Sequence, residues 1–118
     1  MAQRLSVLNV KNGQPYRAPL QVASADGAIT LASGIVHITK AGVCALTLAA
    51  PSDDGLTLFL DSATAQAHTV TITAGLRGAG GGADVLTWGG AIGDGIGLYS
   101  YGGYWFPIPG TTVNVSAG

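Results

Sequence analysis

Short runs of alternating apolar and polar residues, separated by turn residues, fill most of this chain. Alternation with a period of two, with turn residues roughly every 8–12 positions, is typical of an antiparallel sandwich or barrel. In residues 68–73, the alternation places Thr69, Thr71 and Thr73 on one side, as expected for a solvent-exposed β face. Runs that predict strands occur at residues 5–10, 28–31, 35–39, 45–48, 56–60, 68–73, 84–88, 95–101, 104–108 and 111–115.

The composition argues against helices. Gly accounts for 19 of the 118 residues, more than twice the usual ~7%, and it disfavours helix interiors. Helix-forming residues cluster only at residues 49–50 and 62–67, which are too short for a helical period. We therefore expect an all-β fold, a small antiparallel β-sandwich or barrel, in which residues 28–31 and 35–39 are joined by a turn at Ser33-Gly34.

The chain has room for one domain, preceded by an arm. Asn12-Gly13, Pro15 and Pro19 interrupt any long element near the N-terminus. We expect residues 1–20 to form an extended N-terminal arm and residues 21–118 to form the β domain.

Charged residues are scarce. They make up 9% of the chain, and the net charge is −1, against about 25% charged residues in an average soluble domain. Dispersed surface charge keeps proteins apart. A chain with so little of it, and with 47% hydrophobic residues, is expected to cover its apolar surface with identical neighbours.

The few charges are unevenly distributed. Arg4, Lys11 and Arg17 lie in the segment 1–25, which contains no acid, whereas every Asp follows it. Three dispersed cations are too few for a nucleic-acid interface, which needs a cluster of Lys and Arg. They would suit a segment that lies on an acidic protein surface. We therefore take Arg4, Lys11 and Arg17 as candidate binding residues of the arm.

Nothing in the sequence predicts export or a membrane partner. The N-terminal segment 1–10 lacks the apolar run of a signal peptide, and no stretch approaches the ~18 apolar residues of a membrane span. Cys44 is the single cysteine, so no intrachain disulfide framework is expected. These features favour assembly in a cytosol.

The titratable residues occupy positions that are ordinary in β proteins. His37 lies inside one predicted strand and His68 begins another, while Asp53-Asp54-Gly55 before a strand is common turn chemistry. General acid–base or nucleophilic catalysis needs a titratable group beside a partner that tunes it. We expect no catalytic residue and no cofactor, and we expect that the protein is not an enzyme.

A Gly-rich stretch at residues 75–83 is expected to be a flexible loop. Residues 79–86 match a calcium-binding β-helix nonapeptide except at its first Gly, but no second copy follows to complete the oxygen shell. The stretch also lacks the Lys-Ser or Lys-Thr that ends a phosphate-binding loop. The sequence therefore predicts no metal site and no nucleotide site.

Aromatic residues gather around Gly102-Gly103. Tyr99, Tyr101, Tyr104 and Trp105 belong to a predicted hairpin, with Tyr99 and Tyr101 on the same side of their strand. Such a hairpin can stack on a sugar or anchor a protein contact. Equally, Trp105 and Phe106 can belong to the core while the tyrosines cover an edge, and the sequence leaves both alternatives open.

Residues 34–106 resemble the small virion surface proteins of tailed bacteriophages. The resemblance lies in Asp-Gly before an alternating strand, His-Thr-Val-Thr before a Gly-rich loop, Gly-Asp-Gly before another strand, and the hairpin Tyr-Gly-Gly-Tyr-Trp. It implies a β-rich homotrimer, made in the host cytoplasm and carried on the outer surface of the capsid. The absence of a repetitive shaft favours a capsid decoration protein, with the major capsid protein as partner of the arm. The alternative is the receptor- or glycan-binding tip of a phage head or tail fibre, with a host-surface glycan as partner.

Overall fold

The computed structural model describes residues 10–11, 14–15, 17–77 and 83–118, and these contain strands and no helix. No helix in these ranges could therefore span a membrane. The strands are β1 (Val10–Lys11), β2 (Gln14–Pro15), β3 (Leu20–Ala23), β4 (Gly27–Ala28), β5 (Gly34–Ile38), β6 (Ala45–Leu48), β7 (Thr57–Ser62), β8 (Thr69–Leu76), β9 (Ala83–Trp88), β10 (Gly95–Tyr101), β11 (Tyr104–Pro107) and β12 (Val115–Ala117). The prediction of an all-β fold is confirmed.

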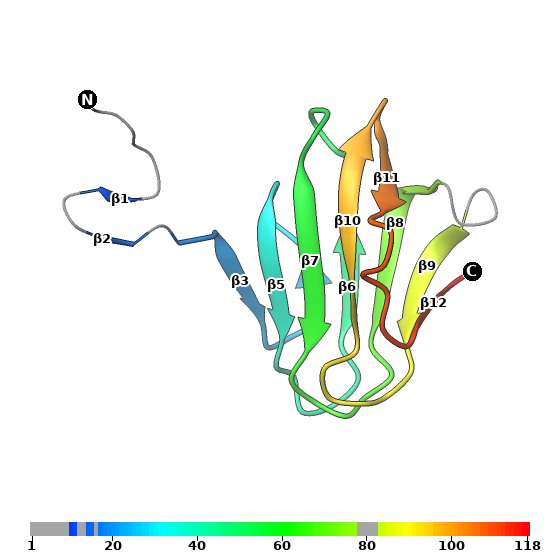
Figure 1. Ribbon diagram of the computed structural model, residues 1–118. Helices are drawn as coiled ribbons and strands as arrows, with labels where there is room; N and C mark the ends of the chain where they lie inside the picture. Colours follow the sequence, from blue (N-terminus) through cyan, green and yellow to red (C-terminus); the bar gives the residue numbers. More distant parts are fainter. Residues whose placement is uncertain (1–9, 12–13, 16, 78–82) are drawn as a thin grey trace.

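The strands form two facing layers that resemble a sandwich (Figure 1). One layer has the order β3-β5-β7-β10-β11, and the other has the order β4-β6-β8-β9-β12. A parallel bridge between Trp105 and Leu76 joins β11 to β8, so the two layers are continuous along one side. The layers do not close into a barrel. Strands β1 and β2 pair with each other, and Figure 1 shows them beyond β3, away from both layers.

The expectation of an antiparallel sheet is wrong for the first half of the domain. Strands β3 to β8 alternate between the two layers, so neighbours within a layer run in the same direction, as β5 and β7 do. Each pass through both layers makes one coil. Gly34 pairs with Leu58 in one layer and Ala45 pairs with Thr69 in the other, so this coil has the same length in both layers, whereas the preceding coil, with Leu20 opposite Ile35 and Gly27 opposite Leu46, is shorter.

The second half of the domain is antiparallel. A tight turn at Gly102-Gly103 joins β10 to β11, and β10 also pairs with β7. Both glycines have positive φ, 60° and 85°, which is the geometry of a two-residue hairpin that follows the natural twist of the strands. Strand β9 lies between β8 and β12, antiparallel to both. The sequence prediction of this aromatic hairpin is confirmed.

The core fills the space between the layers. Inward positions carry almost only aliphatic side chains, to which the second half adds two indoles, Trp88 and Trp105, each 1% exposed. Both indole N–H groups are satisfied: Trp88 donates to the Asp94 carbonyl at 2.9 Å and Trp105 to the Ala49 carbonyl at 2.9 Å. A buried indole that keeps its hydrogen bond contributes its large apolar area without leaving a polar group unpaired.

Some predicted strands differ from those observed. Residues 28–31 do not pair with residues 35–39, because β4 pairs with β6 in one layer and β5 pairs with β3 and β7 in the other. The Gln21 side chain bonds the segment after β4: its oxygen accepts from the Thr30 N–H at 2.8 Å, and its amide donates to the Ala28 carbonyl. Strand β3 was not predicted, and the last strand lies at Val115–Ala117 rather than at residues 111–115. Most of the strand predicted at residues 5–10, and residues 78–82 of the predicted loop, lie outside the described residues.

Candidate functional site

The outer side of the β3-β5-β7-β10-β11 layer is unusually apolar. The strand registers place Leu20, Ile35, Phe59 and Gly97 in one row across four strands. The next row contains Val22 of β3 and ends at Val113, which bridges to Gly95. We call this surface the apolar face. Its exposed apolar residues are Leu20 (59% exposed), Val22 (54%), Ile35 (37%), Phe59 (45%), Tyr99 (37%) and Val113 (55%).

A groove runs along β10 on the apolar face. Ile35 and Phe59 line one side of it and Val113 lines the other, around an open volume of about 380 Å³. Gly95 and Gly97 of β10 form part of its floor. At Gly97 the Phe59 ring lies so close that a Cβ atom would be 2.8 Å from it, so a larger residue would displace the ring. We call this feature the β10 groove.

Polar residues also lie on the apolar face: Thr57 pairs with Tyr99, Thr111 lines the β10 groove, and two further polar side chains bond to each other. The His37 Nδ1 atom donates to the Asp61 Oδ1 atom at 2.7 Å, across neighbouring strands β5 and β7. The side chains are 39% and 49% exposed. The pair places two hydrogen-bonded polar side chains in the row between Val22 and Val113.

Tyrosines extend the apolar face toward the hairpin tip. The rings of Tyr99 and Phe106 stack, with centroids 5.3 Å apart. Tyr101 is 65% exposed, and the Arg77 guanidinium lies 4.1 Å from the centre of the Tyr104 ring, a cation–π contact. Trp105 points the other way into the core. The core alternative therefore holds for Trp105 but not for Phe106, which is only partly buried and stacks on Tyr99.

The outer side of the other layer has a different composition. The registers align Ala45, Thr69, Thr87 and Ser116 across four strands, and a second row contains Thr47 and Thr71 on β6 and β8. We call this surface the hydroxyl face. The row of threonines expected from the sequence to lie on an exposed β face does so, and it extends to neighbouring strands that the sequence did not connect.

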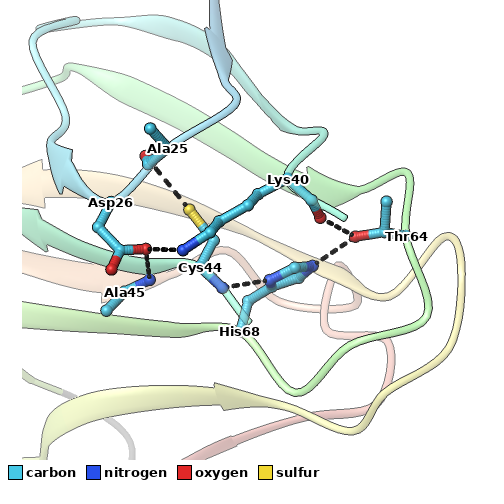
Figure 2. Close-up of polar contacts among 7 residues, drawn as sticks. All are labelled: Ala25, Asp26, Lys40, Cys44, Ala45, Thr64 and His68. Atoms are coloured by element: carbon cyan, nitrogen blue, oxygen red, sulfur yellow. Dashed lines mark hydrogen bonds and ion pairs between the residues drawn. The ribbon is translucent and has the colours of Figure 1, made fainter. Parts of the chain in front are cut away.

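Polar groups bond successive coils at one end of the layers, in the loops that precede β4, β6 and β8 (Figure 2). His68, 0% exposed, accepts the Cys44 N–H at its Nδ1 atom at 3.0 Å. Its Nε2 atom must then carry the proton, and it meets the Thr64 hydroxyl at 3.0 Å, which donates to the Lys40 carbonyl at 2.8 Å. We call this group the corner network. Burial lowers the pKa of His68, so the ring is held neutral.

A second set of bonds extends the corner network to the first coil. The Asp26 carboxylate accepts from the Lys40 ammonium at 2.8 Å and from the Ala45 N–H at 3.0 Å. These two hydrogen bonds lower the pKa of Asp26, that from Lys40 more strongly. The Cys44 thiol lies 3.4 Å from the Ala25 carbonyl (Figure 2). Burial raises the pKa of this thiol, which disfavours the thiolate that a nucleophile or metal ligand requires.

The corner network is organised for structure rather than chemistry. Both nitrogens of His68 are engaged in hydrogen bonds, so neither is free to take a proton from a substrate. Within the part of the chain that the structure describes, no three His, Cys, Asp or Glu residues gather where they could hold a metal ion. The sequence did not reveal this network, because its partners lie far apart along the chain in unlike surroundings.

The predicted arm residues are not brought together by the described structure. Arg4 lies outside the described residues, Lys11 belongs to β1, and Arg17 is exposed just before β3. The apolar face was missed by the sequence predictions, although Phe59 carried a signal for it. A large apolar residue between two inward leucines breaks the alternation of β7, which indicates a strand that is covered on both sides.

No protein-family model, curated protein or solved structure matches this chain. The surface features of the molecule are therefore what bears on its function. The apolar face is the feature of the described residues that is most in need of a partner.

Proposed function

We propose that the protein is a decoration protein of a tailed bacteriophage, which binds the outer surface of the head as a homotrimer and stabilises it. It acts by binding and not by catalysis. Its partners are its own copies and the major capsid protein. It is made in the host cytoplasm and resides on the virion.

The contrast between the two outer faces carries this proposal. A sandwich that exposes Leu20, Val22 and Phe59 on the outer side of one layer and threonines on the outer side of the other has one surface suited to protein and one suited to water. Contiguous exposed apolar surface of this kind marks contact sites. The low charge of the chain adds to this, because a net charge of −1 gives little protection against association.

The demands of capsid decoration fit such a molecule. A shell presents the same site many times, so several weak contacts made by one trimer combine into firm attachment. The arm leads into β3, and its reach is shorter than the ~65–70 Å of a fully extended segment of 20 residues, because β1 and β2 fold back on each other. The positive residues Arg4, Lys11 and Arg17 give this arm its attraction to an acidic shell.

Binding to purified heads of the phage that encodes the chain tests the proposal. The full-length protein should co-sediment with heads at saturating, countable occupancy, and the bound heads should resist heat better than bare ones. A variant lacking residues 2–17 should remain a folded trimer but lose attachment, and salt should weaken the attachment of the intact protein. Full occupancy by the truncated variant would show that the arm is not the anchor, and no binding of the full chain would refute decoration.

A second candidate function has its own observation. Tyr101, 65% exposed at the hairpin tip, and Tyr104 beneath Arg77 present aromatic surface of the kind that stacks on sugars. This favours the receptor- or glycan-binding tip of a fibre. A glycan array separates the two: saturable binding that Tyr101→Ala abolishes, together with no binding to heads, would favour the fibre tip.

A further inference from the structure

Arg77 differs from the other charged residues of the β domain in having no partner of opposite charge. Residues 21–118 contain one Lys and one Arg, Lys40 and Arg77, against six Asp. Lys40 pairs with Asp26 at 2.8 Å. Arg77 is exposed, and in the part of the chain that the structure describes, which includes all six Asp, it forms no ion pair. Its charge is therefore available to an anion from outside the chain.

Two contacts hold Arg77 in place. Its backbone N–H donates to the Trp105 carbonyl at 2.9 Å, which ties the residue to β11. Its guanidinium lies 4.1 Å from the centre of the Tyr104 ring. Stacking uses the flat side of a guanidinium and leaves the N–H groups at its edge accessible, and these match the two oxygens of a carboxylate. Because the ring already orders the side chain, less conformational entropy is lost when an anion binds.

The surroundings of Arg77 suit a sugar rather than a small inorganic anion. Tyr101 and Tyr104 form the last residue pair of the β10–β11 hairpin, so their side chains lie on the same side of the sheet. Tyr101 is 65% exposed, and its ring offers an apolar face to the C–H groups of a sugar. Asp54 is exposed in the loop before β7 and accepts the Gly102 N–H at 2.9 Å. Its carboxylate can also accept hydrogen bonds from sugar hydroxyls.

The strand order β8-β11-β10-β7 arranges these groups in sequence across the hairpin end of the layer: a cation, two aromatic rings and a carboxylate. We propose that this end of the hairpin binds sugars that carry a carboxylate, such as uronic or sialic acids, with Arg77 holding the acid group and Tyr101 the sugar ring. The acid group points toward Arg77, because Asp54 at the other end would repel it. The inference goes beyond decoration. It rests on the second candidate function, glycan binding, and names the class of sugar.

An array of acidic glycans, each printed beside its methyl ester, tests the inference on the unaltered protein. The array carries oligosaccharides of uronic acids and of sialic acids. Esterification removes the charge of each carboxylate and keeps the ring and the hydroxyl groups. The full-length protein should bind acidic members, with at least about tenfold weaker binding to their esters, because a hydrogen bond to a charged group is stronger than one to a neutral group. Equal binding to acids and esters, or no binding to any acidic member, would overturn the inference.

Substitution of the two cations separates Arg77 from a general effect of charge. Arg77→Met should abolish the preference for acids over esters, and Arg77→Lys should keep only part of it, because an ammonium group lacks the planar fork of a guanidinium. The matched control Lys40→Met removes the same charge at the opposite end of the layers and should keep the full preference. Far-ultraviolet spectra and thermal melts establish that each variant is folded. A folded Arg77→Met that still prefers acids would refute the assignment, and the comparison of acids with esters decides even if this variant does not fold.

The outcome is separable from those of the two candidate functions. A protein that binds phage heads but no acidic glycan keeps the decoration role and removes this inference. Binding to neutral sugars that depends on Tyr101 but not on Arg77 keeps the fibre-tip candidate and removes the preference for acids. If the protein binds no glycan and Arg77→Met weakens its attachment to heads, the hairpin end contacts capsid protein, and the sugar assignment is wrong.

Discussion

The two halves of the domain are held together in different ways. In the parallel half, β3 to β8, each strand pairs with one from the next coil, and buried or partly buried polar groups bond the corners. In the antiparallel half, β9 to β12, a tight turn joins β10 to β11, and Trp88 and Trp105 fill the core. The comparison teaches that one half depends on specific hydrogen bonds between distant residues, and the other on apolar area and turn geometry.

The largest effect is expected in the antiparallel half. Trp105→Ala removes a ring that is 1% exposed and leaves the Ala49 carbonyl without its donor. The free energy of unfolding should fall by about 3–5 kcal/mol, measured by urea denaturation at one fixed chain concentration. Tyr101→Ala, on the exposed side of the same hairpin, should change it by less than about 0.5 kcal/mol. Equal losses in the two variants would contradict the assignment of Trp105 to the core.

The next effect concerns the parallel half. His68→Leu keeps most of the buried volume but deprives the Cys44 N–H and the Thr64 hydroxyl of their partner. We expect a loss of about 1–3 kcal/mol, the range for leaving a buried polar group unsatisfied. His37→Leu removes a half-exposed imidazole instead, and should cost less than about 1 kcal/mol. If His68→Leu and His37→Leu had the same free energy of unfolding, the hydrogen bonds of His68 would make no special contribution to stability.

His68 of the corner network should also make the stability of the protein depend on pH. The pKa of His68 is lowered from 6.5 in the folded chain, so below about pH 6.5 the unfolded chain binds more protons than the folded one. The contribution of His68 is therefore fully present above pH 6.5 and is lost as the pH falls toward its lowered pKa. Thermal unfolding between pH 7.5 and 5 should show this slope, and the slope should shrink in His68→Leu. An unchanged slope in that variant would exclude His68 as its source.

The smallest change in the free energy of unfolding is expected for substitutions in the Gly102-Gly103 turn of the antiparallel half. Gly103 has a φ of 85°, so Gly103→Ala should lower the free energy of unfolding by about 1 kcal/mol. Gly102 has a φ of 60°, which asparagine adopts readily. Gly102→Asn should therefore stay within a few tenths of a kcal/mol. Thermal melts compare the two, and the reverse order would rule out the turn geometry described.

Sequence reasoning succeeded where the determinants are local. The alternation located β6, β9 and β10 to within about a residue, because period-two patterning depends only on which side of a strand is buried. Gly102-Gly103 marked its hairpin because few other residues adopt that turn. The all-β fold class and the aromatic hairpin could therefore be predicted.

The parallel pairing could not be predicted, because its determinants are distant and unlike. Residues that occupy equivalent positions in successive coils share no pattern: Gly34 faces Leu58 and His37 faces Asp61. No turn residue in the sequence indicates where the chain crosses to the other layer and returns. The apolar face is missed for the same reason, since it emerges only when Leu20, Ile35 and Phe59 are aligned across strands from separate coils.

The long chain path around each coil has a consequence for the order in which the molecule acquires its structure. During synthesis the parallel half leaves the ribosome first, yet β5 and β7 must close a long loop before they can pair, whereas β10 and β11 meet across a tight turn. Local contacts form sooner than distant ones. Strands β7 and β8 also remain without their neighbours β10 and β9 until these have been made. Pulsed hydrogen exchange during refolding should show β10 and β11 amides protected before those of β5, and it is in this interval that a chain with so little charge is most exposed to aggregation.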